Sequence, residues 1–400
     1  MIGKKFRVSS TTVQNWIDKS LKGEINLELG DEEGRWKVIN NLHNQRLLFE
    51  LSRKAEKFDR MKEKRVEYTV DNKLYEILSP KQVKLLARSL QDDLEIPLKY
   101  VYIGEEGVKR WYTFHEASTK STYSTYLEGH DFFLEVHLDY ILGKFNDRER
   151  GIPKINLIDL GCGTADYTIT CAKKMDKLGL LNSVIALDIS QVMLDRLSNR
   201  FKQKDLKHIP FYSKQCDMDE GLPFDFLFDL SSSEDGRIPA LYLNFGGQIT
   251  NNEVYEQVNM LYNIATVMNK EDRLLVVNSY HEKEMEITYP SAEMDEFFDL
   301  HRWILDLLGI KQEDYTIHFD YSEQEFKRTA GLKLVKDITL NFDKINTLVK
   351  LKAGQELIVW KHRRENHQTV NQNAAATGMR VDLSSTDTDD SLICYMLKKR

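Results

Sequence analysis

The chain has 400 residues, of which 41% are hydrophobic and 30% charged, and its formal net charge is −7. This composition is ordinary for a soluble protein with material for roughly two or three domains, and the negative charge argues against a protein that coats nucleic acid indiscriminately, although it leaves a local basic patch open. No apolar run approaches the roughly 18 residues of a membrane helix, and the N-terminus lacks the apolar segment of a signal peptide, so we expect a cytoplasmic protein without a membrane partner. The four cysteines show no metal-ligand spacing, which predicts reduced thiols and no metal site.

Residues 1–70 begin with a segment that resembles the turn and recognition helix of a helix-turn-helix module. Val13, Trp16 and Ile17 recur at i, i+3 and i+4 and would pack inward, which leaves polar side chains outward with groups suited to base edges. Only about six residues precede the turn, too few for the first helix of a normal module. Two interpretations remain, a DNA-contacting module or a small helical cap or dimerisation arm.

Residues 71–150 are predicted to form a helical lid or substrate region. One helix is expected to begin at Ser79 and Pro80, because serine caps a helix N-terminus and proline suits its first position. Further along, a stretch rich in aromatic and hydroxyl side chains contains Tyr123 and Tyr126. These tyrosines could hydrogen-bond an amine or stack on a ring, or they could simply pack in a core.

An acid and two glycines, Asp159, Gly161 and Gly163, lie between an apolar run and a segment with a helical pattern. The run indicates a buried parallel strand, and the glycines allow a sharp turn where a ligand can approach the backbone. A dinucleotide fingerprint needs glycine or alanine where this chain has Asp166, and a Walker A loop needs a Gly-Lys-Ser/Thr that does not follow here. The spacing acid-x-Gly-x-Gly-x-small, which ends at Ala165, resembles motif I of the Rossmann-like S-adenosylmethionine methyltransferases.

The next segments alternate between helical and buried-strand patterns. Helices are expected from about residue 167 to 178 and after Ser190, which would cap the second helix. Strands are expected at residues 184–188, 210–214, 240–245 and 273–278. In the methyltransferases the acid that ends the second strand takes two ribose hydroxyls, and the loop after the third strand holds the adenine. The resemblance therefore implies S-adenosyl-L-methionine as the cofactor, bound by Asp159, Gly161, Gly163, Asp188, Ile189, Asp217, Met218 and Asn244.

About 90 residues separate the fifth predicted strand from the end of the sheet, which is expected to finish with a helix at 368–376 and strands at 379–383 and 392–398. This insert is predicted to hold one helix at 294–308 and strands at 316–319, 332–342, 348–351 and 356–361. The predicted fold class is α/β, with a Rossmann-like seven-stranded methyltransferase sheet, a β-rich insert between strands 5 and 6 and an N-terminal helical or winged-helix-like region. The predicted domains are 1–70, 71–150, the methyltransferase core at 151–290 and 366–400, and the substrate-domain insert at 291–365.

This arrangement resembles the histidine Nα-methyltransferases of ergothioneine biosynthesis over roughly residues 70–400. In that family a Leu-Gly-x-x-Ile-Gly-Asn segment follows the fourth strand, and the matching Phe-Gly-Gly-Gln-Ile-Thr-Asn puts Asn251 in the role of orienting the substrate. The family's glutamate and serine, which recognise the histidine side chain, correspond here to Trp360 and His362. The resemblance therefore implies a more aromatic, less acidic pocket for a different amine or an aromatic compound, unless His362 is simply an exposed strand residue.

The implied reaction is in-line methyl transfer to the nitrogen of a small amine or amino-acid-like substrate. It needs a positioned nucleophile and the exclusion of water, and no dedicated acid or base if the amine arrives neutral. Candidates for holding the substrate at the reaction centre are Tyr123, Tyr126 and Asn251. Trp360 and His362 are the candidates for contacting the side chain of the substrate. Two alternatives remain. The first is a nucleic-acid methyltransferase targeted by the N-terminal module, although this chain lacks the Asp/Asn-Pro-Pro-aromatic motif expected of an enzyme that methylates base amino groups. The second is a cofactor-sensing regulator that binds DNA.

Overall fold

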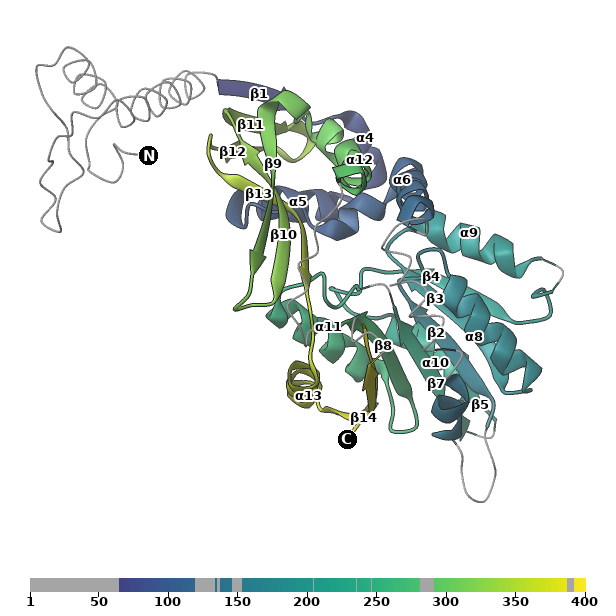
Figure 1. Ribbon diagram of the computed structural model, residues 1–400. Helices are drawn as coiled ribbons and strands as arrows, with labels where there is room; N and C mark the ends of the chain where they lie inside the picture. The colour runs from purple at the N-terminus through teal and green to yellow at the C-terminus, as the bar shows by residue number, and fades with distance from the viewer. Residues whose placement is uncertain are drawn as a thin grey trace, which may run out of the picture.

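The computed structural model describes residues 65–118, 134, 137–145, 153–203, 205–234, 236–245, 247–280, 291–386 and 392–400. Figure 1 shows these residues as two lobes, a larger one around a seven-stranded sheet and a smaller one that combines the helices after residue 70 with the insert. The helix-turn-helix-like segment before residue 65 and the candidate tyrosines Tyr123 and Tyr126 lie outside the described residues.

The seven-stranded sheet has the order β14-β15-β8-β7-β2-β3-β4. Its strands are β2 (Ile155–Leu160), β3 (Leu181–Asp188), β4 (Phe211–Gln215), β7 (Ala240–Asn244), β8 (Arg273–Ser279), β14 (Met379–Thr386) and β15 (Leu392–Lys399). The five neighbouring strands β8, β7, β2, β3 and β4 run parallel, and at one edge β15 runs antiparallel between β8 and β14. The predicted Rossmann-like fold with an insert between its fifth and sixth strands is therefore confirmed.

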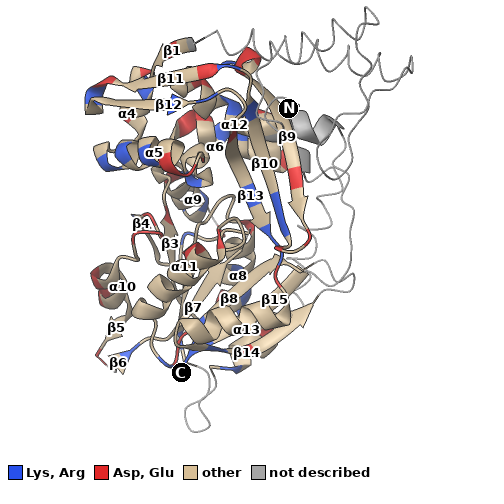
Figure 2. Ribbon diagram, turned by 90° about the vertical axis from the view of Figure 1, so that its left-hand side faces the viewer, with Lys and Arg blue, Asp and Glu red and all other residues tan. Residues whose placement is uncertain are grey.

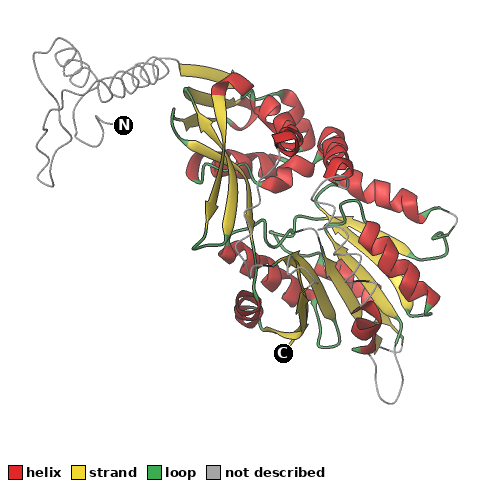
Figure 3. Cartoon of the chain, in the orientation of Figure 1, coloured by secondary structure: helices red, strands yellow, loops and turns green. Residues whose placement is uncertain are grey.

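Helices cover both faces of this sheet (Figure 3). They are α8 (Asp166–Lys177) and α9 (Gln191–Phe201) on one face and α10 (Phe224–Ser231), α11 (Val254–Val267) and α13 (His367–Ala376) on the other. Every residue of β2 is buried, and its side chains alternate between the two cores: Leu157 packs with α8 and α9, and Ile158 packs with α10, α11 and α13. This burial on both faces explains why the central strands are continuous apolar runs in the sequence.

Two predicted helix starts have different outcomes. Ser79 caps α5 (Pro80–Asp92) as expected, with a reciprocal capping box between Ser79 and Gln82. Ser190 occupies the N-cap position of α9, but its hydroxyl makes no capping hydrogen bond. The carboxylate of Asp188 instead accepts a hydrogen bond from the backbone N–H of Ser190 at 2.8 Å. At the N-terminus of α9 the side-chain acceptor is therefore Asp188 and not the Ser190 hydroxyl.

The insert contains α12 (Ser291–Leu308), β9 (Tyr315–Ser322), β10 (Lys327–Leu334), β11 (Asp337–Phe342), β12 (Thr347–Leu351) and β13 (Glu356–Arg363). The strands form two three-stranded sheets, β13-β10-β9 and β1-β11-β12. The single strand predicted at 332–342 is wrong, because the chain leaves the first sheet after Leu334 and enters the second at Asp337. The backbone N–H of Val335 donates to the carbonyl of Asp314 at this break, a tertiary contact with no local sequence signal.

The smaller lobe has one hydrophobic core built from two distant parts of the sequence. Strand β1 (Arg65–Thr69), which sequence patterns did not predict, pairs in parallel with β11 of the insert. Helices α4 (Asn72–Ile77) and α5, the 3-10 turn η1 (Leu98–Tyr102), α12 and strands β10 to β13 bury their apolar side chains together. The early part of the predicted segment 71–150, up to Ile103, therefore shares a core with the insert, whereas Leu138 and Leu142 from its later part pack in the core of the larger lobe. In the described part of the chain, none of the helices has the length and apolar character of a membrane span.

A buried polar network joins the end of the insert to the methyltransferase sheet. Glu365 follows β13 and is almost fully buried. Its carboxylate accepts hydrogen bonds from Asn278 on β8 at 2.5 Å and from the hydroxyl of Tyr395 on β15 at 3.0 Å. Burial raises the pKa of Glu365, and these two donors partly offset the cost of the buried charge.

Replacing Tyr395 with phenylalanine is expected to lower the free energy of unfolding by about 1–3 kcal/mol, because a buried carboxylate loses a donor. The matched control is Tyr100→Phe, since the buried hydroxyl of Tyr100 has no hydrogen-bond partner among the described residues. That change should leave stability within about 0.5 kcal/mol of the wild type. Urea unfolding at pH 7 measures both values, and equal losses would contradict the role given to the network.

Candidate functional site

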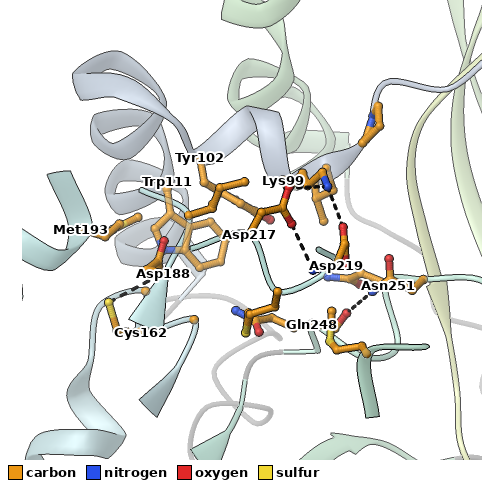
Figure 4. A pocket seen from close by; sticks show the side chains of 18 of the residues that line it. Lys99, Tyr102, Trp111, Cys162, Asp188, Met193, Asp217, Asp219, Gln248 and Asn251 are labelled. Atoms are coloured by element: carbon orange, nitrogen blue, oxygen red, sulfur yellow. Dashed lines mark hydrogen bonds and ion pairs between the residues drawn. The ribbon is translucent and has the colours of Figure 1, made fainter. Parts of the chain in front are cut away.

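A cavity of about 520 Å³ lies between the two lobes, at the carboxyl ends of the central parallel strands. The larger lobe contributes the turn after β2, the ends of β3 and β4 and the loop before α11. The smaller lobe contributes side chains from η1, from α6 (Gly104–Ser118) and from β13. Figure 4 shows Lys99, Tyr102 and Trp111 above the residues of the sheet. This is the edge of an open α/β sheet at which ligands bind.

The turn after β2 has a backbone that favours glycine. Gly161 and Gly163 have φ values of 75° and 47°, and Ala165 adopts the left-handed region with φ 60° just before α8. A Cβ added to Gly161 would lie 1.3 Å from Nε2 of Gln248, so a larger residue would displace that side chain. The sharp turn expected from the sequence is present and lines the cavity.

Asp159 lies near the end of β2 and lines the cavity from beneath the turn. Its carboxylate accepts a hydrogen bond from the hydroxyl of Thr168 on α8. Burial raises the pKa of Asp159 to about 7, and the nearby charge of Asp188 adds to the rise while Thr168 opposes it. The side chain can therefore change charge near neutral pH.

Asp188 ends β3 beside the glycine turn and is 7% exposed. One carboxylate oxygen accepts the backbone N–H of Ser190, and the other lies 3.6 Å from Sγ of Cys162. Burial raises the pKa of Asp188, and the same burial, together with the neighbouring acids, raises the pKa of the Cys162 thiol well above its usual value. Cys162 is consequently a neutral thiol and is poorly suited to act as a nucleophile.

The cavity next to Asp188 has an apolar wall. Ile189 and Met218, both predicted from the sequence, line it together with Met193 and Trp111. The Trp111 ring meets Tyr102 edge-on, with 5.2 Å between ring centroids, so two elements of the smaller lobe hold it in place. An aromatic face and thioether side chains provide a surface on which a flat base can stack.

Asp217 follows β4 and is bound to the smaller lobe. Nζ of Lys99 lies 2.7 Å from a carboxylate oxygen of Asp217 and 2.7 Å from one of Asp219. Burial lowers the pKa of Lys99, but the two carboxylates outweigh this effect and the net shift is upward. Lys99 therefore stays charged and links η1 to the loop that the sequence assigned to the adenine.

Asn244, at the end of β7, is fully buried and lies behind the cavity wall. Its Nδ2 donates to Oε1 of Gln248 at 3.1 Å, and Gln248 is the residue that reaches the cavity. The Oδ1 atom of Asn244 has no hydrogen-bond partner among the described residues. The sequence prediction named Asn244, whose side chain lies behind the lining, and it missed Gln248, whose position in the loop after the fourth strand could have suggested it.

The three predicted substrate residues lie together, but they face the cavity differently. Asn251 lines the cavity, and its Oδ1 lies 2.9 Å from Nδ1 of His362. Trp360 and His362 stack with parallel rings 5.7 Å apart and are not among the lining residues. The assignment of these two to the substrate pocket is corrected, because side chains alternate along β13 and the intervening Lys361 is the one that faces the cavity.

Lys361 forms an ion cluster that sequence patterns missed. Its Nζ lies 3.0 Å from carboxylate oxygens of both Glu95 and Glu256, which come from the smaller and the larger lobe respectively. The Lys361 side chain is 8% exposed. The two partners are 266 and 105 residues away in the sequence, so only the inward-facing alternation of β13 could have indicated Lys361.

The cavity lining is strongly acidic. Two lysines line it, Lys99 and Lys361, against eight acids: Asp93, Glu95, Asp159, Asp188, Asp217, Asp219, Glu253 and Glu256. The expectation of a more aromatic, less acidic pocket depended on Trp360 and His362, which do not line the cavity; the aromatic side chains that do line it come from other elements and accompany these acids. A lining with this charge favours positively charged ligands.

Comparisons with known protein families and solved structures both find methyltransferases. The family model of the histidine-specific, SAM-dependent methyltransferases matches residues 84–399. A crystal structure of an S-adenosylmethionine-dependent methyltransferase from Clostridium acetobutylicum ATCC 824 aligns with a TM-score of 0.40 and 10% identity over 72% of this chain and 98% of that one. The CcbJ methyltransferase from Streptomyces caelestis aligns with a TM-score of 0.37 and 10% identity over 61% and 83% of the two chains. No curated protein matches the sequence.

The family match begins within α5 and includes the glycine turn, the insert and the last strands of the sheet. It covers well over half of the chain, and it includes every described element that lines the cavity. The strand order of the sheet and the turn after β2 agree with this assignment. The chain therefore belongs to the family of histidine-specific methyltransferases, and it is an enzyme that depends on S-adenosylmethionine.

Proposed function

We propose that this methyltransferase acts on the nitrogen of a small amine or amino-acid-like substrate. The observation that carries the proposal is the acidic cavity of about 520 Å³ between the lobes, which the cofactor and a small acceptor would share. Its carboxylates would attract a protonated amine, and they would repel the phosphates of a nucleic acid. The electrostatics therefore favour a small cation over DNA or RNA as the acceptor.

The residues at the sheet edge fit S-adenosylmethionine. The glycine turn lines the cavity next to the carboxylate of Asp159, where the amino-acid end of the cofactor would lie, and the Gln248 side chain that fills the position beside Gly161 would border it. Asp188 ends its strand with a carboxylate that can accept two ribose hydroxyls. Ile189 and Met218, with the Trp111 ring, offer apolar contacts to the adenine. We assign these residues to the cofactor on the basis of this chemistry.

When bound, S-adenosylmethionine supplies an activated methyl group. The protein's part is to hold the acceptor nitrogen in line and to keep water out. Asn251 and Gln248 lie on the loop next to the glycine turn and would hold the acceptor, while Lys99 and Lys361 keep the smaller lobe closed over the cavity. A protonated amine has no free lone pair, so its nitrogen must lose a proton before it can accept the methyl group, and the carboxylates of the lining could take that proton.

The direct test incubates the purified protein with methyl-labelled S-adenosylmethionine and a panel of L-amino acids and amines, with DNA and RNA in parallel reactions. We expect label in the nitrogen of a small molecule, which mass spectrometry would locate. Label in nucleic acid would overturn the proposal and favour the alternative of a targeted nucleic-acid methyltransferase. Tight cofactor binding with no labelled product from the panel or from a cell extract would favour the sensor alternative.

Asp188→Asn is expected to weaken binding of S-adenosylhomocysteine by about 10- to 100-fold, because charged hydrogen bonds to the ribose are worth roughly 1.5–3 kcal/mol. The matched control is Asp195→Asn, an exposed acid on α9 just after this site. It should bind as the wild type does. Isothermal titration calorimetry at fixed pH and salt measures both, and an unchanged affinity in Asp188→Asn would remove Asp188 from the cofactor site.

The affinity for S-adenosylmethionine is expected to rise with pH between about 6 and 8. Asp159 has a pKa of about 7 in the free protein, so below that pH it is mostly protonated and must lose a proton before it can stabilise a cation. The rise should approach about tenfold per unit well below the pKa and level off above it. Asp159→Asn should give a flat profile; a slope that survives in this variant would assign the effect to another group.

A further inference from the structure

A chain of hydrogen bonds connects the methyltransferase sheet to the substrate side of the cavity through His362. Nε2 of His362 lies 3.0 Å from Oγ of Ser279, at the end of β8, and Nδ1 lies 2.9 Å from Oδ1 of Asn251. Asn251 lines the cavity, whereas His362 does not. His362 therefore contacts a cavity residue from behind.

The chemistry of the three groups determines the direction of each bond. The Oδ1 atom of Asn251 can only accept, so Nδ1 of His362 must carry the hydrogen and donate it. In a neutral ring Nε2 then has a lone pair and accepts the hydroxyl hydrogen of Ser279. With its carbonyl oxygen engaged by His362, the amide of Asn251 has its NH2 group left for the cavity.

Several contacts hold His362 in this role. Its ring stacks in parallel on Trp360, with 5.7 Å between centroids. Burial lowers the pKa of His362 to about 3, and the charges of Arg364 and Arg328 add to the effect, so the ring is neutral at physiological pH. In the backbone beside it, the N–H of Arg363 donates to the carbonyl of Thr250 at 2.8 Å, which fastens β13 to the loop that carries Asn251.

We propose that His362 is a positioning residue that holds Asn251 with its NH2 group toward the cavity, where it donates to an oxygen of the substrate such as a carboxylate. This inference rests on the proposed function, because it concerns the acceptor side of the same cavity. It assigns the two ends of the substrate to different groups. The carboxylates of the lining bind the amine, and the NH2 group of Asn251 donates a hydrogen bond to an oxygen. An amine that also carries a carboxylate satisfies both.

The tautomer of His362 tests the proposal without a substrate. Long-range ¹⁵N–¹H NMR on the full-length protein, with His362→Gln to assign the signal, should show hydrogen on Nδ1 and none on Nε2 between about pH 6 and 8. A ring protonated on Nε2 alone would overturn the proposal, because Asn251 would then donate to His362 and turn its carbonyl to the cavity. A doubly protonated ring would overturn it as well. This result stands whether or not any amine is methylated.

A matched pair of substitutions tests the effect on the substrate. In His362→Asn the amide NH2 falls near the position of Nδ1 and keeps the donor to Asn251, whereas in His362→Gln it falls near Nε2 and keeps only the bond to Ser279. We expect His362→Gln to raise KM for the methylated amino acid about tenfold with kcat within about twofold, as loss of one oriented hydrogen bond predicts. His362→Asn should stay within about threefold of the wild type in both constants.

The probes are L-histidine with histamine and L-tryptophan with tryptamine, which differ in the carboxylate alone. The wild type and His362→Asn should prefer the amino acid of a pair, and His362→Gln should lose about tenfold of that preference. Equal effects of both substitutions, or no change in the preference, would overturn the positioning role. Binding of S-adenosylhomocysteine and the thermal midpoint serve as controls and should be unchanged. If none of these four probes is methylated, the panel and the cell extract described above still decide the proposed function, and the tautomer decides the role of His362.

Discussion

The shared hydrophobic core of the smaller lobe is the constraint on which the site depends. Neither the helices after residue 70 nor the insert has a core of its own, and their apolar faces are buried only against each other. That joint packing holds η1 and α6 beside β13, although the end of α6 at Ser118 and the start of β13 at Glu356 are 238 residues apart in the chain. Lys99, Trp111 and Lys361 reach one cavity for this reason. Figure 1 shows the resulting lobe above the carboxyl edge of the sheet.

Ion pairs determine how the two lobes meet. Lys99 binds acids after β4, Lys361 joins Glu95 to Glu256, and Arg363 binds Glu253 at 2.6 Å. Figure 2 shows basic segments on β10 and β13 of the insert. Breaking a partly buried pair leaves a charge without compensation, so these contacts disfavour other placements of the lobes more than they add stability. They also leave the cavity with a surplus of carboxylates, which suits a cationic cofactor and the proposed amine substrate.

Local sequence patterns predicted one side of the cavity and not the other. The residues around the glycine turn were predictable, because Asp159, Gly161 and Asp188 lie at fixed places in consecutive strands and turns. The substrate side was not. Its side chains come from β13, η1 and the loop before α11, and a shift of one residue along β13 exchanges His362 for Lys361 at the cavity. A family motif aligned without that register could find the strand but not the side chain that faces inward.

By itself, the sequence determined the seven-stranded fold, the place of the insert and the edge of the sheet at which the cavity lies. These features follow from local signals: buried runs, helical periodicity, and glycines at positive φ. Only the tertiary structure decided that the insert and the early helices share a core, that β1 pairs with β11, and that the pocket is acidic. Each of these depends on contacts between residues far apart in the chain, and such contacts leave no periodic pattern in the segments that make them.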